Sequence, residues 1–138
     1  MEAYDVIVAG VGGMGSATVA HLARRGVRVL GLEQYDIPHD RGSSHGLSRI
    51  IRLAYFEHPA YVPLLHRAYE LWWGLERDVQ ERLLIITGSL DIGTVDSPVF
   101  GGALKAAQWH HLVHEVLEPG ELRRRFPGYG LHTPLLGL

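Results

Sequence analysis

Residues 5–15 read Asp-Val-Ile-Val-Ala-Gly-Val-Gly-Gly-Met-Gly, and this stretch decides the fold. Its apolar, β-branched start extends back to position 4 and predicts a strand over residues 4–9, buried on both faces of a parallel sheet. Gly10, Gly12 and Gly15 then match the pattern G-x-G-x-x-G. Between a predicted strand and a predicted helix, that pattern is typical of a turn that binds a dinucleotide.

The glycines of this turn have separate physical roles. Gly10 permits a tight turn, Gly12 lets the backbone approach a pyrophosphate, and Gly15 allows close helix packing. The helix that follows offers free N–H groups and the positive end of its dipole to an anion. The alternative is a glycine-rich turn without a ligand, followed by an unrelated surface glutamate.

The next residues complete a βαβ unit. A helix-compatible pattern over residues 14–25 ends at Gly26, and a second apolar run covers residues 27–32. Glu33 follows this run, where a carboxylate can accept hydrogen bonds from ribose hydroxyls. The fold class is therefore α/β, with an N-terminal βαβ of a Rossmann-like dinucleotide-binding domain.

The rest of the chain predicts mainly helices. A long periodic helix begins near Pro59 or Pro63 and runs to about Val79. The remaining elements are a strand region with a bend at Gly88 over residues 83–93, a helix from Ser97-Pro98 to about Leu112, and a short helix from Pro119 that ends before Pro127.

Two parallel strands and one crossover helix make an incomplete sheet, because parallel sheets need helices on both faces. We therefore expect the chain to be the N-terminal piece of a longer protein, or to complete its sheet through another chain. We also expect the 138-residue chain alone to self-associate and to be inactive as an enzyme.

Composition excludes several classes of function. With 13 Lys+Arg against 15 Asp+Glu, the net charge of -2 disfavours nucleic acid and anionic membranes as partners. The chain has no cysteine, so it offers no disulfide, thiolate nucleophile or zinc–thiolate site. His110, His111 and His114 include an i, i+4 pair, but no Glu of an H-E-x-x-H motif and no third ligand accompany it, so we interpret them as histidines on a helix surface and predict no metal site. The N-terminus lacks a signal-peptide pattern, which predicts a cytoplasmic protein.

The segment 42–52, Gly-Ser-Ser-His-Gly-Leu-Ser-Arg-Ile-Ile-Arg, combines one imidazole with two guanidiniums. If residues 48–52 turn helically, His45, Arg49 and Arg52 project from a single face. Arginine binds a planar carboxylate or phosphate through two hydrogen bonds. Spacing alone leaves a solvated basic loop as the alternative.

Together with residues 5–15, this loop resembles the monomeric sarcosine oxidase and N-methyltryptophan oxidase family. Further segments agree with the family in order and approximate spacing, namely residues 61–64, 70–72, 87–90 and 125–128. The glycine turn is shared by many flavoproteins, whereas Gly-Ser-Ser-His-Gly at residues 42–46 followed by Arg49 and Arg52 is more diagnostic.

The resemblance implies an FAD-dependent oxidase of secondary amines or N-methyl amino acids, in which flavin takes up hydride and oxygen is reduced to hydrogen peroxide. It implies that His45 and Arg49 lie against the flavin ring and that Arg52 binds the substrate carboxylate. It also implies the following cofactor contacts: Gly10, Gly12, Gly13, Met14 and Gly15 to the pyrophosphate, Glu33 to the adenosine ribose, and Ser43 and Ser44 elsewhere on FAD.

The family interleaves its two domains, so residues 1–84 resemble the first segment of the FAD-binding domain and residues 85–138 the start of the substrate domain. The cysteine that typically carries the family's flavin lies in the C-terminal half and has no counterpart in this chain. Two alternatives stay open. One is an NAD(P)-dependent dehydrogenase, because the glycine turn and Glu33 serve either dinucleotide, and the other is a truncated, non-catalytic nucleotide-binding module.

Overall fold

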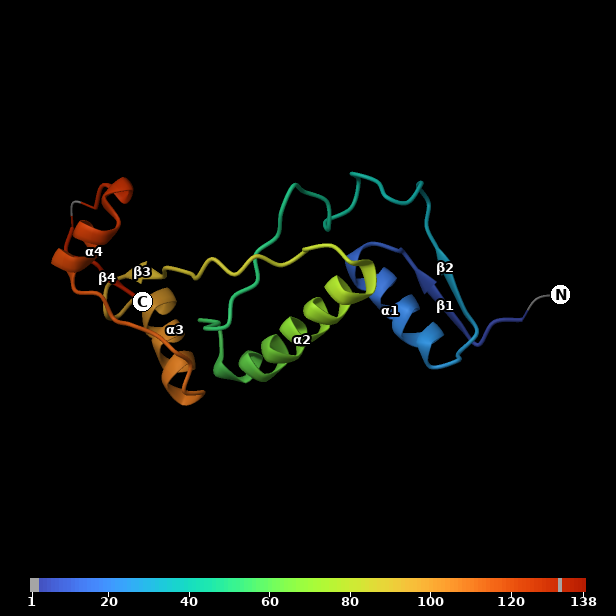
Figure 1. Cartoon of the computed structure of the whole chain (residues 1–138), viewed down its shortest axis with the longest axis horizontal. Helices are drawn as coiled ribbons and strands as arrows, with labels where there is room; N and C mark the ends of the chain where they lie inside the picture. The colour runs from blue at the N-terminus through green and yellow to red at the C-terminus, as the bar shows by residue number, and fades with distance from the viewer. Residues whose placement is uncertain (1–2, 132) are drawn as a thin grey trace. The chain divides into compact units, whose positions relative to one another are not determined.

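The computed structural model describes residues 3–131 and 133–138 (Figure 1). Contacts divide the chain into two compact units, the first ending at Arg49 and the second beginning at Ile50, and each is described by itself. In the described parts of the chain, none of the helices has both the length and the apolar character needed to cross a membrane.

The first unit is a βαβ motif, as predicted. Its two strands are parallel neighbours, with Val6 opposite Val29 and Ala9 opposite Leu32. Gly10 N continues the pairing by donating to Leu32 O at 2.7 Å. The elements are β1 (Val6–Ala9), α1 (Gly13–Arg24) and β2 (Val29–Leu32).

The start of this sheet is closed by an ion pair. Asp5 N donates to Arg28 O at 2.8 Å, and Arg28 Nη2 donates to Asp5 Oδ1 at 2.7 Å. The Arg28 guanidinium holds the pKa of Asp5 below its usual range. Close packing over β2 favours glycine at position 31, because a Cβ there would lie 3.0 Å from Val11 Cγ2 and 3.3 Å from Val19 Cγ2 of α1.

The prediction that the first strand is buried on both faces is wrong for this chain. Ile7 in β1 is 61% exposed, and no residue described in the first unit is fully buried. The physical reason is that α1 is the one helix described in this unit, and one helix cannot cover both faces of a sheet. The predicted incomplete sheet is therefore confirmed in the described residues.

The second unit contains the hydrophobic core. Val62, Phe100 and Leu122 are its largest fully buried side chains. Ser97 is the N-cap of the helix over Pro98–Trp109, and its hydroxyl accepts a hydrogen bond from Phe100 N at 3.1 Å, as predicted. The elements are η1 (Pro59–Tyr61), α2 (Val62–Val79), β3 (Ile92–Gly93), α3 (Pro98–Trp109), α4 (Pro119–Arg125), η2 (Pro127–Tyr129) and β4 (Leu136–Gly137).

A small antiparallel sheet pairs the C-terminal residues of this unit with the segment that precedes α3. Ile92 lies opposite Gly137 in the β3–β4 pair. Just outside it, Asp91 N donates to Leu138 O at 3.0 Å and Leu138 N donates to Asp91 O at 2.9 Å. Leu117 forms a bridge to Gly137 on the other side. Asp91 is therefore fixed by its backbone at the edge of the core.

Two predicted boundaries in this unit are wrong. Residues 83–91 are irregular rather than extended in a sheet, because Leu83 N and Leu84 N donate to the Glu76 carboxylate instead of to a neighbouring strand. The third helix ends at Trp109 rather than near Leu112, since His111 adopts a left-handed φ of 52°. The three histidines therefore follow the helix and do not share its surface.

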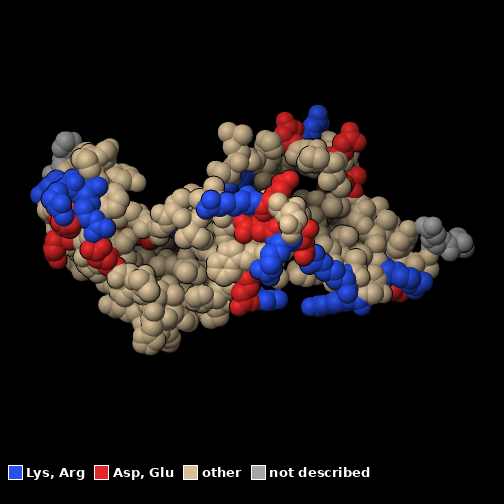
Figure 2. Space-filling model, in the orientation of Figure 1, with Lys and Arg blue, Asp and Glu red and all other residues tan. Residues whose placement is uncertain are grey.

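Figure 2 shows acidic and basic side chains lying beside one another on the face in view. The ion pairs of the chain include two within a helix, Arg67 with Glu70 at 2.6 Å and Arg124 with Glu121 at 2.7 Å. Exposed pairs of this kind are weak, because water and salt screen the two charges. They balance charge locally and add little to stability.

Candidate functional site

The glycine turn has the backbone geometry that the sequence motif requires. Gly10 has a φ of 87°, a conformation that residues with a side chain rarely adopt. A Cβ at Gly15 would overlap the carbonyl oxygen of Gly10. Gly10 is therefore favoured by its backbone conformation and Gly15 is required by steric contact, and α1 can begin directly against the end of β1.

The N-terminus of α1 takes an oxygen acceptor from outside the helix. Its N-cap residue is Gly12, which provides no side-chain cap. The Gly13 N–H instead donates to the hydroxyl of Ser44 at 2.9 Å. This hydroxyl oxygen lies where a phosphate oxygen would accept the same hydrogen bond. The turn and Ser44 thus fit a pyrophosphate, and Met14, which is largely exposed, lies in the first turn beside them.

Glu33 is held as a carboxylate at the end of β2. Its Oε2 accepts a hydrogen bond from Val11 N at 2.8 Å, and its Oε1 accepts one from Gln34 N at 2.8 Å. The Val11 N–H, followed by that of Gln34, lowers the pKa of Glu33. The glycine turn and the predicted ribose ligand are therefore connected directly.

A cavity of about 590 Å³ opens beside Glu33. His39 Nδ1 accepts from Arg41 N at 3.1 Å, so the neutral ring carries its proton on Nε2, which lies 3.5 Å from Glu33 Oε1. The centroids of the Tyr35 and His39 rings lie 5.1 Å apart. The Arg41 guanidinium carbon lies 4.7 Å from the centroid of the Tyr35 ring. The lining residues are Glu33, Gln34, Tyr35, Asp36, Pro38, His39 and Arg41.

Sequence reasoning missed Tyr35, His39 and Arg41 as members of this site. The signal available was their position directly after the predicted ribose ligand, in a proline-containing loop. Aromatic and imidazole rings with a guanidinium can stack on a planar nucleobase. The cavity thus has the chemistry to take the nucleoside end of a dinucleotide.

The predicted helical turn over residues 48–52 is wrong: the structure describes all of these residues and they are not helical. Arg49 instead reaches back along its own loop, with Nη1 donating to Ser48 O at 2.8 Å and Nη2 to Ser43 O at 3.3 Å. His45 is exposed, and its backbone N donates to Gly42 O at 3.2 Å. The helical face that would group His45 and Arg49 with the next arginine is therefore not formed.

Arg52 belongs to the second unit and lies between two carboxylates. Its Nη1 is 3.9 Å from Asp91 Oδ1, and its Nη2 is 3.9 Å from Glu57 Oε1. The guanidinium carbon lies 5.0 Å from the Tyr55 ring centroid and 5.3 Å from that of Phe56. Sequence reasoning did not connect Asp91 with Arg52, because a sequence separation of 39 (91 − 52) leaves no local signal.

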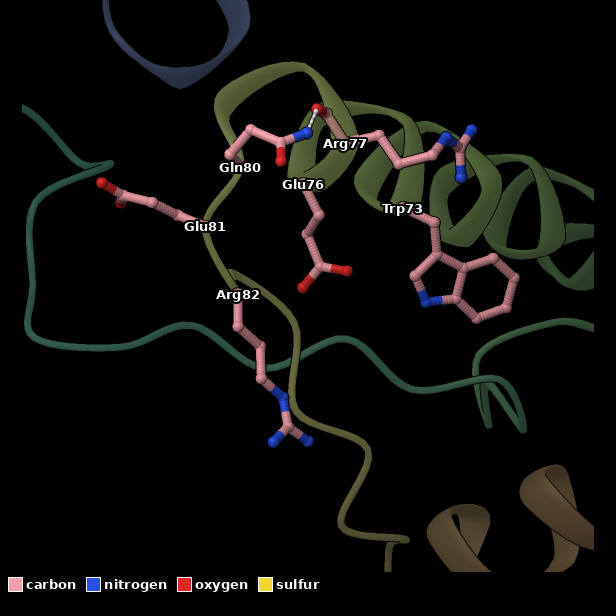
Figure 3. Close-up of a pocket in the computed structure, with 6 residues that line it drawn as sticks. All are labelled: Trp73, Glu76, Arg77, Gln80, Glu81 and Arg82. Atoms are coloured by element: carbon pink, nitrogen blue, oxygen red, sulfur yellow. Dashed lines mark hydrogen bonds between the residues drawn. The ribbon is translucent and has the colours of Figure 1, made fainter.

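A second cavity, of about 530 Å³, lies at the C-terminal end of α2 (Figure 3). Gln80 closes one side by donating to Arg77 O at 2.7 Å, and Glu76 is engaged by the backbone of the segment that follows the helix. Its lining residues are Trp73, Glu76, Arg77, Gln80, Glu81 and Arg82, which include none of the predicted site residues. The Glu76 contacts give this region a structural role.

Residues 5–137 match the family model for FAD dependent oxidoreductases. The chain belongs to this family. The glycine turn, Glu33 and the loop that carries Ser44 all lie within the matched region, so the geometry described above is that of a family member.

Relatives within the FAD dependent oxidoreductases are oxidases by name. The chain is 53% identical over 124 residues to a monomeric sarcosine oxidase of Streptomyces avermitilis, covering 90% of this chain and 32% of that protein. It is 38% identical to human peroxisomal sarcosine oxidase, covering 99% and 35%. It is 34% identical to N-methyl-L-tryptophan oxidase of Citrobacter koseri, covering 98% and 36%.

Among solved structures, a variant of NikD in its open form matches with a TM-score of 0.83 and 32% identity. NikD is described as an unusual amino acid oxidase essential for nikkomycin biosynthesis, and the match covers 99% of this chain and 36% of NikD. The chain thus spans about a third of the length of the relatives that it matches.

Proposed function

We propose that the enzyme to which this chain belongs is an FAD-dependent oxidase of secondary amines, with N-methyl amino acids as its substrate class. The observation that carries the proposal is the glycine turn closed by Glu33, in a chain of the FAD dependent oxidoreductase family. The names of its relatives support the substrate class, since sarcosine and N-methyl-L-tryptophan are both N-methyl amino acids. The family match favours FAD over a nicotinamide dinucleotide.

Within the first unit, the pyrophosphate of FAD would lie against the turn from Gly10 to Gly15 and the Ser44 hydroxyl. Glu33 would accept hydrogen bonds from the ribose. When bound, FAD would supply the hydride acceptor for the carbon beside the amine nitrogen, which would leave an iminium ion, and the reduced flavin with one proton would reduce O₂ to H₂O₂. Ser43 is proposed as a further cofactor contact.

His45 and Arg49 are proposed to lie beside the flavin ring. Both are on the loop that Ser44 connects to the glycine turn. A fixed positive charge at this position would stabilise negative charge that develops on the ring during reduction. The Arg49 guanidinium can supply such a charge, because arginine stays protonated, and the exposed His45 imidazole can donate a hydrogen bond beside it.

Arg52 is proposed to bind the substrate carboxylate. Its guanidinium makes no hydrogen bond to any described residue, so its N–H donors are available to a ligand. Arg52→Lys removes the planar pair of donors, and kcat/KM for an N-methyl amino acid should fall by about tenfold or more. The matched amine without a carboxylate should be affected much less. Equal losses on both substrates would exclude this role.

The cofactor is tested by the visible spectrum of the purified enzyme, followed by reconstitution with FAD or NAD. Flavin absorbance at stoichiometric occupancy, with peroxide formed from N-methyl amino acids, is the expected result. NAD binding without flavin absorbance would favour a dehydrogenase. Flavin absorbance without turnover of any amine would favour a non-catalytic nucleotide-binding module. The domain boundary at residue 84 and the cytoplasmic location stay predictions.

A further inference from the structure

Asp91 is the buried charged residue of the second unit, with 8% of its surface exposed. Its backbone is held by two hydrogen bonds to Leu138, but its carboxylate accepts no hydrogen bond from the residues that the structure describes. A buried carboxylate without partners is unfavourable unless a cation balances it. That cation is Arg52, at 3.9 Å from Oδ1.

Arg52 only partly offsets the cost of burying the Asp91 carboxylate. Burial raises the pKa of Asp91, the charge of Arg52 lowers it, and Glu57 raises it again, with a net upward shift. A carboxyl group whose pKa is higher in the folded than in the unfolded protein destabilises the fold when it is ionised at neutral pH. The charge of Asp91 is thus retained at a cost in stability, which points to a different role.

The surroundings of Arg52 show what that role is. The guanidinium lies against the rings of Tyr55 and Phe56, and a Cβ at Gly102 of α3 would overlap the carbonyl oxygen of Phe56. The backbone of Phe56 therefore packs closely against α3. At 3.9 Å, Asp91 attracts the guanidinium without using its N–H donors in a direct hydrogen bond.

We propose that Asp91 is a positioning residue, which holds the Arg52 guanidinium over Tyr55 and Phe56 in the orientation that receives the substrate carboxylate. The inference rests on the proposed role of Arg52. Without Asp91, the remaining ion-pair partner in the described residues is Glu57, which is 43% exposed and would draw the guanidinium towards solvent. Holding a long side chain in advance reduces the conformational entropy lost on binding.

An opposing effect is repulsion between Asp91 and the substrate carboxylate. Asp91 faces Nη1, whereas Nη2 faces the exposed Glu57. A ligand carboxylate that replaces Glu57 at Nη2 would be separated from Asp91 by the guanidinium itself. Positioning therefore outweighs repulsion in this geometry.

The test is Asp91→Asn in the flavin-loaded enzyme, which removes the charge and keeps the shape. KM for an N-methyl amino acid should rise roughly tenfold, while kcat and the KM of the amine without a carboxylate change less than about twofold. The inhibition constant of propionate should rise in parallel, with propionamide as the uncharged comparison. The melting temperature should stay the same or rise. The matched control is Asp96→Asn, an exposed carboxylate on the same segment, which should leave each of these values unchanged.

Three results would overturn the inference. A lower KM for the amino acid would mean that repulsion dominates. Equal increases in KM for both substrates, or a lower melting temperature without a split between them, would mean that Asp91 is structural. Arg52→Lys tests the proposed role of Arg52 separately. If Arg52→Lys affects the amino acid more than the amine without a carboxylate, but Asp91→Asn does not, the proposed function stands and the role of Asp91 is excluded. No split with either variant removes both.

Discussion

The first unit of this chain carries the recognisable sequence motif, whereas the second unit carries the hydrophobic core. The first unit carries the glycine turn, Glu33 and the Ser44 loop, yet no residue described in it is fully buried. The second unit carries all the buried residues of the described chain, yet has no recognisable nucleotide motif. Binding geometry in the first unit thus comes from backbone conformation and hydrogen bonds, whereas the second is organised by the burial of apolar side chains.

The sharpest way to break this comparison is to remove a core side chain from the second unit. Phe100→Ala deletes a fully buried ring from α3 and should cost about 3–5 kcal/mol of unfolding free energy. The paired change in the first unit, Ile7→Ala, removes a side chain that is 61% exposed and should cost less than about 1 kcal/mol. Urea unfolding of both variants measures the difference. Similar costs would mean that Ile7 is covered in solution.

FAD affinity, in contrast, should depend on substitutions in the first unit more than on substitutions in the second. Gly15→Ala places a Cβ against the carbonyl oxygen of Gly10, so the turn must open and FAD affinity should fall by about a hundredfold. The control is Gly120→Ala in α4, where a Cβ meets nothing within 4 Å and alanine favours the helix. FAD titration by fluorescence compares the two. Unchanged affinity in Gly15→Ala would separate the glycine turn from cofactor binding.

The smallest expected effect concerns Glu33 and pH. Hydrogen bonds from Val11 and Gln34 hold its pKa below the ordinary value of 4.5, so the stabilisation from the carboxylate is fully present above about pH 4.5. That stabilisation is lost as the pH falls through the lowered folded value. Glu33→Gln should weaken FAD binding roughly tenfold at pH 7. It should also reduce the loss of FAD affinity that the unmodified protein shows as the pH falls below about 4.5. If FAD affinity falls with decreasing pH in the same way in Glu33→Gln, another group is responsible for that pH dependence.

Exposed apolar surface in the first unit also bears on the expected self-association. Ile7 and Leu32 are both more than half exposed, on the two strands of a sheet that one described helix partly covers. Large exposed apolar areas favour association. The expectation that this chain associates with itself stays a prediction, and gel filtration of the isolated chain is its direct measurement.

The sequence by itself determined the βαβ unit, the glycine turn and the position of Glu33. These depend on local rules, since Gly10 and Gly15 are required by the backbone within a few residues and the strand periods are short. Ser97 was predictable as an N-cap for the same reason. Family membership was also evident, because the loop over residues 42–52 has a specific pattern in the sequence.

Only the tertiary structure decided the rest. It brought Asp91 beside Arg52, although their sequence separation is 39 (91 − 52), and it placed Ser44 on the Gly13 N–H. It also kept residues 48–52 out of a helix, because the Arg49 side chain binds the backbone of its own loop instead. Contacts between distant segments depend on how the whole unit packs, and a local pattern of residue types carries no information about that packing.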